Sequence, residues 1–415
     1  MEYSPKLYTE ITNRITANPH QRITFAEYMD LALYHPEHGY YSQQANDLGK
    51  QGDFFTSVHL GADIGEMLAI QFVEMWEILG QPESFELIEM GAGQGYLAAD
   101  ILNYIKKEYS DFFKSLKYTI IEKSSGLKQL QQQRLKEFDI TWCELEQISN
   151  NSIIGCFFSN ELVDAFPVHQ FTIENGELKE IYVTTNKQTE KDTEKQRNNE
   201  INLPPLSPSP PPPLPSSPSK LFTEITDQPS TPKLPDYLNS LEIDINQYPS
   251  GYRSEINLAA LEWLSVVADR LQRGYVLTID YGYIKNRYYN PRRERGTLQC
   301  YTRHHRHNDP YINIGQQDIT AHVDFTALEK NGDRQGLQKI GLTQQGLFLM
   351  ALGLGERIAD LSQSNQPLST ILKRRDSLHQ LLDPMGLGGF HVLVQAKGLQ
   401  NTELLQKLKG LIQPQ

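Results

Sequence analysis

The chain has 415 residues and a formal net charge of −12 at pH 7. This length exceeds one minimal domain and leaves room for a catalytic core with additions. The negative charge argues against general binding to nucleic acid or to anionic membranes, which both need positive surface, and it suits a neutral or basic partner.

Three cysteines, Cys143, Cys156 and Cys300, are widely spaced and include no C-x-x-C pair. This spacing predicts neither a disulfide framework nor a zinc ribbon, so we expect no metal site. No apolar run approaches the length of a membrane span. Residues 1–5 show neither a signal-peptide core nor an Arg-rich transit pattern. We therefore expect a cytoplasmic protein that does not insert into a membrane.

The first 80 residues predict helices. Thr24 and Glu27 form a capping box that begins one helix. A second helix begins at Ile64, carries apolar residues at helical spacing and stops at Gly80. We expect residues 1–80 to form a helical N-terminal extension that covers the rest of the protein as a lid.

The segment between these two helices contains further candidate site residues. Asp53, Thr56 and Ser57 are small or polar residues next to two phenylalanines. One interpretation is a lid over a bound ligand or substrate. The other is a plain helix start with Thr56 or Ser57 near the cap, and the residues favour neither.

Strands and helices alternate from residue 85 onward. The predicted strands cover 85–89, 118–122, 153–159, 275–281 and 391–396, and the predicted helices cover 96–109, 127–137 and 258–273. Alternation of this kind predicts a parallel sheet with right-handed crossovers. The fold class is therefore α/β.

One segment interrupts this pattern. Residues 184–236 are polar and charged, with prolines concentrated at 204–218. Such a composition cannot bury enough apolar surface to offset its ordering entropy, so it predicts a disordered Pro-rich insertion with polyproline II character. The insertion divides the core into 81–183 and 237–415. A spacer is the plainer role, and a Pro-x-x-Pro ligand for an SH3-like partner is the alternative.

A glycine-rich turn follows the first predicted strand. Residues 89–95 read Glu-Met-Gly-Ala-Gly-Gln-Gly, and a dinucleotide-binding G-x-G-x-x-G would need its third glycine at Tyr96. Bare backbone at a helix N-terminus lets a ligand approach closely and favours negative charge. The pattern resembles the first motif of S-adenosylmethionine-dependent methyltransferases, in which the loop holds the amino-acid end of the cofactor. The resemblance makes these residues candidates for cofactor binding: Glu89, Gly91, Gly93 and Gly95.

Glu122 ends the next predicted strand. An acid at this place accepts hydrogen bonds from a ribose diol in nucleotide-binding folds, so Glu122 is a candidate cofactor residue. Its separation from Gly91 is longer than the usual spacing of about 20 residues. The alternative is an ordinary exposed acid at a strand end.

Asn160, Glu161 and Asp164 follow the third predicted strand. Ligands of open α/β sheets lie at the carboxyl ends of the strands, so these side chains should face the cofactor. Nucleic-acid amino-methyltransferases usually carry Pro-Pro and an aromatic residue here to stack a flipped base, and Glu161-Leu162 replaces the prolines. Two carboxylates suit a guanidinium instead, which they could orient and help to deprotonate. The alternative is a turn cap at Asp164 and a solvated Glu161.

Two later segments carry further polar groups. Residues 287–307 are dense in Arg, Tyr and His, a composition that could grip RNA but also fits a basic loop for substrate binding or intramolecular pairing. Residues 317–325 alternate polar and apolar residues, as in a strand lining a site. His322 within it is a candidate proton carrier or substrate contact, with a structural histidine as the alternative.

Together these segments resemble the MidA-like methyltransferase family, whose mitochondrial members are complex I assembly factors that methylate an arginine. The matching stretches cover most of the chain outside the insertion: 28–41, 52–57, 89–95, 159–171, 274–282, 296–301, 317–328, 383–386 and 390–393. The resemblance implies a Rossmann-like class I methyltransferase core with an N-terminal helical extension, and S-adenosyl-L-methionine as the cofactor.

The resemblance also implies methylation of a protein arginine, with Glu161 and Asp164 as catalytic residues and Asn160 on the cofactor. A subunit of an NADH dehydrogenase-type complex is the implied substrate, and an oligomer is compatible with the sequence. The Pro-rich insertion and the lack of a transit pattern depart from the mitochondrial members. Two rival functions stay open: a non-catalytic assembly chaperone that keeps the fold, and a small-molecule or RNA methyltransferase.

Overall fold

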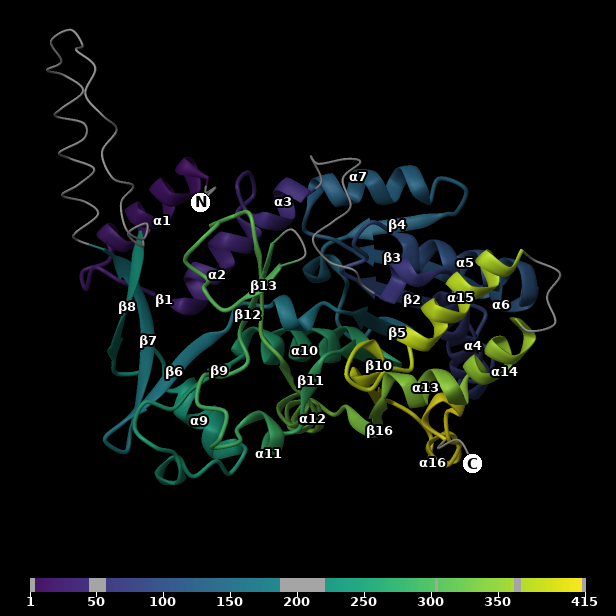
Figure 1. The fold of residues 1–415 in the computed structure, drawn as a ribbon. Coiled ribbons are helices and arrows are strands. Elements are labelled where there is room, and N and C mark those ends of the chain that lie inside the picture. Colours follow the sequence, from purple (N-terminus) through teal and green to yellow (C-terminus); the bar gives the residue numbers. More distant parts are fainter. Residues whose placement is uncertain (1–3, 45–56, 187–220, 303–304, 362–366, 413–415) are drawn as a thin grey trace, which may run out of the picture.

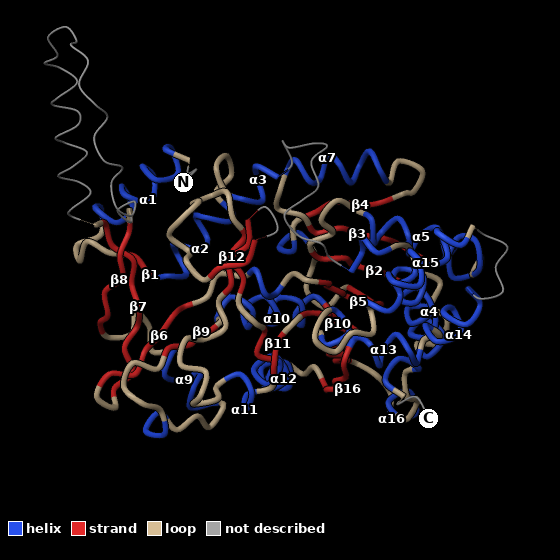
Figure 2. The backbone as a smooth tube through the Cα atoms, in the orientation of Figure 1, coloured by secondary structure: helices blue, strands red, loops and turns tan. Residues whose placement is uncertain are grey.

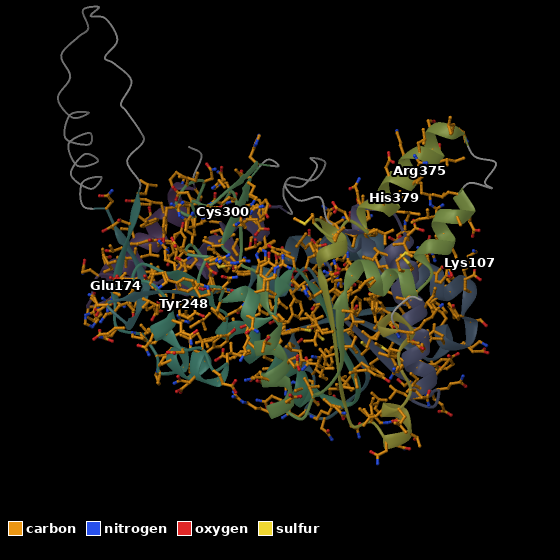
Figure 3. All side chains as sticks on the ribbon, turned by 60° about the horizontal axis from the view of Figure 1, so that its bottom comes forward. Lys107, Glu174, Tyr248, Cys300, Arg375 and His379 are labelled. Carbon is orange, nitrogen blue, oxygen red and sulfur yellow. The ribbon has the colours of Figure 1, made fainter. Side chains whose placement is uncertain are left out.

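The computed structural model describes residues 4–44, 57–186, 221–302, 305–361 and 367–412. Two parts lie side by side in Figure 1: a large sheet covered by helices, and a smaller antiparallel sheet that packs with the N-terminal helices. Figure 3 places Lys107 and Arg375 at the end of the large sheet and Glu174 and Tyr248 at the end of the smaller one. The two parts meet near the cavity described below.

The large sheet is the α/β core that the sequence predicts. Its order is β16 (Gln338–Gln344), β17 (His391–Lys397), β10 (Leu271–Asp280), β5 (Ile153–Asn160), β2 (Phe85–Met90), β3 (Leu116–Ile121) and β4 (Ile140–Cys143). The strands from β10 to β4 are mutually parallel, and only β17 runs antiparallel to its two neighbours. The prediction of parallel strands is therefore confirmed for β2, β3, β5 and β10, whereas the strand predicted over 391–396 runs antiparallel as β17, so the sheet is mixed.

Helices cover both faces of this sheet. One apolar cluster joins it to α4 (Asp63–Ile78), α5 (Tyr96–Glu108), α6 (Ser110–Ser115), α13 (Gln345–Ala351), α14 (Leu354–Leu361) and α15 (Leu368–Gln380). A second cluster joins the other face to α10 (Leu258–Arg270) and α12 (Phe325–Arg334). Ile64, Leu68, Phe72 and Met75 recur at helical spacing on α4 and are buried. Each such side chain contributes roughly 1.5–3 kcal/mol by leaving water.

The smaller sheet has the order β1 (Ile23–Thr24), β7 (Glu177–Thr185), β6 (His169–Glu174) and β9 (Arg253–Ile256), with β8 (Phe222–Asp227) also paired to β7. All its pairings are antiparallel, and Figure 2 shows its strands on the opposite side of the molecule from β4. The strands of the smaller sheet come from all four segments predicted from the sequence, which are 1–80, 81–183, 184–236 and 237–415. The division into these segments stays a prediction.

The N-terminal helices pack on the smaller sheet. They are α1 (Pro5–Ala17), α2 (Phe25–Tyr34) and α3 (Tyr40–Gln44). The predicted capping box is present at the start of α2, where the Thr24 side chain accepts from the Glu27 backbone and Glu27 reaches back to the Thr24 N–H. Phe25, Tyr28 and Met29 of this helix are buried against Val183 and Phe222. This packing holds α2 and α3 beside the large sheet.

Shorter elements complete the fold. They are a three-stranded sheet of β12 (Gln299–Thr302), β13 (His305–His307) and β14 (Asp318–Thr320), the pair β11 (Gly282–Tyr283) and β15 (Val323–Asp324), and the helices α7 (Ser125–Arg134), α9 (Lys233–Ser240), α11 (Lys285–Tyr288) and α16 (Asn401–Leu404). The expected single strand over 317–325 is thus two short strands, and Phe325 begins α12.

Two local predictions are corrected by the structure. The segment 184–236 is not an insertion throughout, because Phe222–Asp227 pair with β7 and α9 begins at Lys233, with Phe222 and Leu234 buried. Residues 187–220 lie outside the described residues. The helix predicted over 258–273 ends at Arg270, and Gly274 lies inside β10 rather than stopping a helix. A Cβ there would meet the Gly155 carbonyl oxygen of β5 at 1.9 Å, so close strand approach explains this glycine.

Candidate functional site

A cavity of about 560 Å³ opens at the carboxyl ends of β2, β3 and β5. Carboxyl ends of parallel strands meet at one edge of a sheet, which is where open α/β folds bind ligands. The opposite wall comes from the N-terminal helices through Tyr34, Tyr40 and Tyr41. The smaller sheet therefore takes part in the site indirectly, because it holds α2 and α3 over the edge of the large sheet.

The glycine turn after β2 forms the floor of the cavity. Gly91 and Gly93 have φ angles of +71° and +52°, a left-handed conformation that favours glycine. The Gly91 N–H donates to the Ile121 carbonyl at 3.0 Å, which fastens the turn to β3. Among the described residues, no atom beyond the two adjoining residues lies within 4 Å of the position of a Cβ on Gly93. A ligand can therefore lie directly against this backbone, next to the N-terminus of α5, where Gly95 is the N-cap.

Glu122 lies beside this turn because β3 is the parallel neighbour of β2. Its two carboxylate oxygens accept from the Ser124 N–H at 2.9 Å and from Gln131 Nε2 at 3.0 Å. Burial raises the pKa of Glu122, and the hydrogen bonds from Ser124, Gln131 and Lys123 oppose that rise. A carboxylate has about four acceptor positions, so Glu122 can still accept hydroxyl groups of a ligand.

Gln131 of α7 is a residue that the sequence did not single out. It is fully buried, and its Nε2 donates both to Glu122 and to the Gly93 carbonyl at 2.8 Å. Its Oε1 accepts from Trp142 Nε1 at 3.0 Å. The side-chain amide of Gln131 thus holds the glycine turn in a fixed position relative to the Glu122 carboxylate. A helical glutamine carries no sequence signal of this role, because its partners lie on other elements.

The long spacing between the glycine turn and Glu122 has a structural cause. The helix that follows the turn is succeeded by a second one, α6 (Ser110–Ser115), before β3 begins. Phe112 of α6 is buried against Phe85 and Trp76. The extra helix lengthens the connection without moving the strand end, so Glu122 lies where a shorter connection would also place it.

Glu89 lies at the end of β2 and lines the same cavity. Its Oε2 accepts from the Tyr118 hydroxyl at 2.7 Å. Burial raises the pKa of Glu89 to about 7, with the Tyr118 hydrogen bond lowering it and Glu122 raising it. Near neutral pH both the protonated and the ionised form of Glu89 are therefore populated.

The segment after β5 brings acids to the other end of the cavity. Glu161 has a φ angle of +53°, which is uncommon for a residue other than glycine and costs on the order of 1–3 kcal/mol. Its N–H donates to the Ile279 carbonyl of β10 at 2.9 Å. Its Oε1 accepts from Asn160 Nδ2 at 3.3 Å, while the buried Asn160 Oδ1 has no hydrogen-bond partner in the part of the chain that the structure describes. Strain of this kind persists where the surrounding structure holds a side chain in place, often at a functional site.

Asp164 lies in a short 3-10 helix, Val163–Ala165, and is 5% exposed. Burial raises its pKa to about 6, and the neighbouring Tyr281 hydroxyl lowers it. The backbone around Asp164 is fixed from two sides: its carbonyl accepts from the Ala321 N–H at 2.9 Å, and the Tyr34 hydroxyl donates to the Ala165 carbonyl at 2.9 Å.

Asp280, at the end of β10, supports this acid segment from behind. One of its oxygens accepts from three successive backbone N–H groups, those of Leu162, Val163 and Asp164, at 3.2, 2.9 and 3.3 Å. Asp280 is fully buried, and burial, Asp164 and Glu161 together hold its pKa well above the usual range. Sequence reasoning placed a strand here but did not identify the acid at its end.

Asp318 of β14 is another cavity residue that the sequence did not single out. It is 5% exposed, and its Oδ1 accepts from the Tyr41 hydroxyl at 2.9 Å. Tyr41 in turn stacks on Tyr34 with ring centroids 5.3 Å apart. Acidic and aromatic side chains therefore surround the same end of the cavity. Asp318 lies in the 317–325 segment that the sequence predicted to line a site. The sequence singled out His322 in this segment, whereas the residue that lines the cavity is Asp318.

The remaining candidates lie elsewhere. His322 is not among the cavity-lining residues; it lies behind Tyr281, with the ring centroids 5.0 Å apart. Burial, Arg293 and Arg306 lower its pKa to about 4, so His322 is neutral at physiological pH. Ser57 begins a 3-10 helix, Ser57–Leu60, whose next residue, Val58, lines the cavity. Asp53 and Thr56 lie outside the described residues.

Two further observations concern metals and membranes. In the described ranges, no group of three or more His, Cys, Asp or Glu side chains is arranged to hold a metal ion. None of the helices that the structure describes is long and apolar enough to cross a membrane.

Comparison with known proteins agrees with this site. A family model described as an S-adenosyl-L-methionine-dependent methyltransferase matches residues 67–343. The chain is 25% identical over 392 residues to the protein arginine methyltransferase NDUFAF7 homolog, mitochondrial, of Drosophila melanogaster, covering 88% of this chain and 79% of that protein. It is 24% identical over 407 residues to the human protein arginine methyltransferase NDUFAF7, mitochondrial, covering 91% and 81%.

A solved structure shares the fold. The crystal structure of a protein from Burkholderia thailandensis bound to S-adenosyl-homocysteine superposes with a TM-score of 0.78 at 24% identity, covering 99% of this chain and 97% of that one. The predicted Rossmann-like core with its N-terminal helical extension is thereby confirmed.

The prediction of a cytoplasmic location is wrong by the same comparison, because the Drosophila, mouse and human relatives are mitochondrial proteins. A missing transit pattern in residues 1–5 was too weak a ground for that prediction. The family model covers most of the chain and carries the parallel sheet, the glycine turn and the acid segment after β5. The chain therefore belongs to the MidA-like family of S-adenosyl-L-methionine-dependent methyltransferases.

Proposed function

We propose that this methyltransferase transfers the methyl group to a nitrogen of an arginine side chain on a protein. The observation that carries the proposal is the acid end of the cavity, where the carboxyl groups of Glu161, Asp164 and Asp318 line the wall. Among the lining residues that the structure describes, Lys123 is the single lysine or arginine, and its Nζ lies 5.7 Å from the Tyr34 ring centroid. Such an end favours a cationic group with several donors. The names of the fly and human relatives, protein arginine methyltransferases at about a quarter identity, point to the same substrate class.

The residues of the glycine end fit S-adenosylmethionine. The open face of Gly93 and the N-terminus of α5 suit the amino-acid end of the cofactor, and Glu122 suits the hydroxyl pair of its ribose. The buried Asn160 Oδ1 has no hydrogen-bond partner among the described residues and can accept a donor of the bound cofactor. Glu89 and Gly91 shape the same wall. When bound, the cofactor supplies an electrophilic methyl group on a positively charged sulfur.

Glu161 and Asp164 are the proposed catalytic residues. An arginine side chain has a pKa above about 12 and is a poor nucleophile while protonated. Carboxylates that bind two of its nitrogens hold its charge away from the third, which then attacks the methyl carbon as the bond from carbon to sulfur breaks. The attacking nitrogen loses one proton in this step. Asp164, with its pKa raised to about 6 by burial, is suited to receive it.

The substrate protein follows from the family resemblance rather than from the cavity. A subunit of an NADH dehydrogenase-type complex is the first substrate to test, because the mitochondrial members of the family are complex I assembly factors. The relatives share the NDUFAF7 name, and the chain covers about four fifths of their length.

The first experiment is calorimetric titration of the protein with S-adenosylmethionine, with NADH as the control ligand. We expect binding of the methyl donor alone, because Tyr96 occupies the position of the third glycine of a dinucleotide site. Binding of neither ligand would favour the non-catalytic chaperone.

The second experiment separates an enzyme from a chaperone. Glu161→Gln keeps the left-handed backbone and the size of the side chain but removes the charge. We expect turnover on an arginine-containing substrate to fall by about 100-fold or more, with unchanged affinity for the cofactor. The matched control is Glu137→Gln, the same change at an exposed position outside the cavity. Mass spectrometry locates the methyl group; full activity of Glu161→Gln, or methylation of lysine instead of arginine, would refute the proposal.

A further inference from the structure

Three arginines gather outside the acid end of the cavity. The guanidinium carbons of Arg287 and Arg293 lie 4.3 and 4.4 Å from the ring centroid of Tyr283. Tyr283 stacks on His322 at 4.8 Å, and Arg293, Arg306 and Arg287 all lie close enough to His322 to lower its pKa. We call Arg287, Arg293 and Arg306 the arginine rim.

The arginine rim has unused hydrogen-bond donors. Within the described residues, no carboxylate lies within ion-pair distance of any of its three members, whereas other arginines, such as Arg253 with Glu224, form such pairs. The guanidinium groups of Arg287 and Arg293 lie over the Tyr283 ring, and among the described residues neither group donates a hydrogen bond to a protein acceptor. Arg306 donates its Nε–H to Gln299, so its two terminal nitrogens remain.

The rim adjoins the acid end of the cavity. Tyr281 lies between them, because its ring is 5.0 Å from that of His322 and its hydroxyl lies beside Asp164. Tyr301 gives a second link: burial raises its pKa, Arg306 opposes that rise, and Asp164 and Asp318 add to it. Arg287 and Arg306 are exposed, and Arg293 is half-buried. A polypeptide whose side chain reaches Asp164 would thus pass close to the rim.

We propose that the arginine rim binds a carboxylate of the substrate protein, so that the methylated residue lies in an acidic stretch. The inference rests on the proposed function, because it takes the protein substrate from there. Charge complementarity selects the occupant: within the described residues the three arginines have no carboxylate at ion-pair distance, so an acidic segment is attracted at the rim although the chain as a whole carries a net charge of −12. The acid end receives the cationic side chain, and the rim receives the neighbouring carboxylate.

The test is fluorescence anisotropy with the full-length protein saturated with S-adenosyl-homocysteine. The probes are two labelled peptides that each contain one arginine, flanked either by glutamates or by glutamines. We expect the glutamate peptide to bind more tightly at low ionic strength, and its advantage to shrink as salt is added. Arg287→Gln together with Arg293→Gln should weaken binding of the glutamate peptide by about fivefold to tenfold, since each exposed charge pair is worth a few-fold.

A matched control is available in the same loop. Arg292→Gln with Arg295→Gln removes two charges from exposed arginines that are not among those lowering the pKa of His322. We expect this variant to bind both peptides like the wild type. Equal binding of the two peptides, or equal losses in both double variants, would overturn the inference.

A competition experiment covers the other class of anion. If a short single-stranded RNA binds more tightly than the glutamate peptide and depends on Arg287 and Arg293, the rim is a nucleic-acid contact and the inference fails. Peptide binding involves no methyl transfer, so its outcome is independent of the activity assay. If the glutamate peptide binds through the rim but no arginine is methylated, the proposed function is refuted while the inference about the rim stands.

Discussion

The two ends of the cavity are built from contacts of very different range. At the glycine end, Gln131 bonds to Gly93 and to Glu122, which are 38 and 9 residues away. At the acid end, Asp280 holds Asp164 across 116 residues. A compact stretch of sequence therefore builds the glycine end, whereas the acid end is assembled from remote segments. This difference teaches that a local motif can reveal the end proposed to bind the cofactor, while the end proposed to bind the substrate depends on tertiary contacts.

The electrostatics of the two ends differ as well. Both oxygens of Glu122 accept hydrogen bonds that stabilise its charged form. Asp164 and Asp280 instead lie close together in a buried environment, and Asp164 contributes to the raised pKa of Asp280. Like charges at close range disfavour ionisation of both groups. The acid end is thus arranged to gain from the arrival of a cation, whereas at the glycine end the hydrogen bonds from Ser124 and Gln131 already oppose the rise that burial causes in the pKa of Glu122.

The largest expected effect concerns the support of the acid end. Asp280→Ala removes the acceptor of four backbone N–H groups, those of Leu162, Val163, Asp164 and Tyr281, which should lower the free energy of unfolding by about 3–4 kcal/mol. Little repulsion is relieved in return, because the pKa of Asp280 is already well above its usual range. Urea denaturation measures the change. Asp280→Asn keeps one oxygen, so its free energy of unfolding should fall by about half as much. An Asp280→Ala variant as stable as the wild type would contradict the idea that long-range contacts hold the acid end together.

The next effect tests the glycine end. Gly93→Val fills space that is open toward the cavity, so affinity for S-adenosylmethionine should fall by about 100-fold, or about 3 kcal/mol. The matched control is Gly176→Val in the turn between β6 and β7, where φ is +81° and no atom lies within 4 Å of a Cβ. Both variants carry similar backbone strain of about 1–2 kcal/mol. Equal cofactor affinity in the two, measured by calorimetry, would remove Gly93 from the site.

A smaller effect follows from the carboxyl group of Glu89. Burial raises its folded-state pKa to about 7 from 4.5, so the folded protein keeps this proton longer than the unfolded chain. Its contribution to stability is therefore full below about pH 4 and is lost as pH rises through about 7, on the order of 2 kcal/mol. Chemical denaturation across this range should show a flatter profile for Glu89→Gln. An unchanged profile would mean that Glu89 ionises normally.

The smallest effect concerns the amide that joins the glycine turn to the acid. Gln131→Leu keeps the size of the side chain but loses the bonds to Gly93 and Glu122, which should weaken cofactor binding by about fivefold, or about 1 kcal/mol. Gln132→Leu, at the neighbouring exposed position, is the control and should bind normally. A loss in both variants would show that α7 tolerates no change, rather than that the amide matters.

Much of the fold could be predicted because the signals are local. The capping box at Thr24, the apolar spacing of α4 and the alternation of strands and helices from β2 onward each depend on neighbouring residues. That alternation predicted parallel strands but not their order in the large sheet, which only the structure gives. The smaller sheet could not be predicted in the same way, since its pairings join β1, β7, β8 and β9 across long separations.

The sequence alone determined the cofactor turn and the presence of acids after β5, because both depend on residue type and on position at a strand end. Only the tertiary structure decided that Asp318, Asp280 and Gln131 belong to the site and that His322 lies outside the cavity wall. The physical reason is that a buried hydrogen bond depends on distance in space. Strands and helices bring its partners together whatever their separation along the chain.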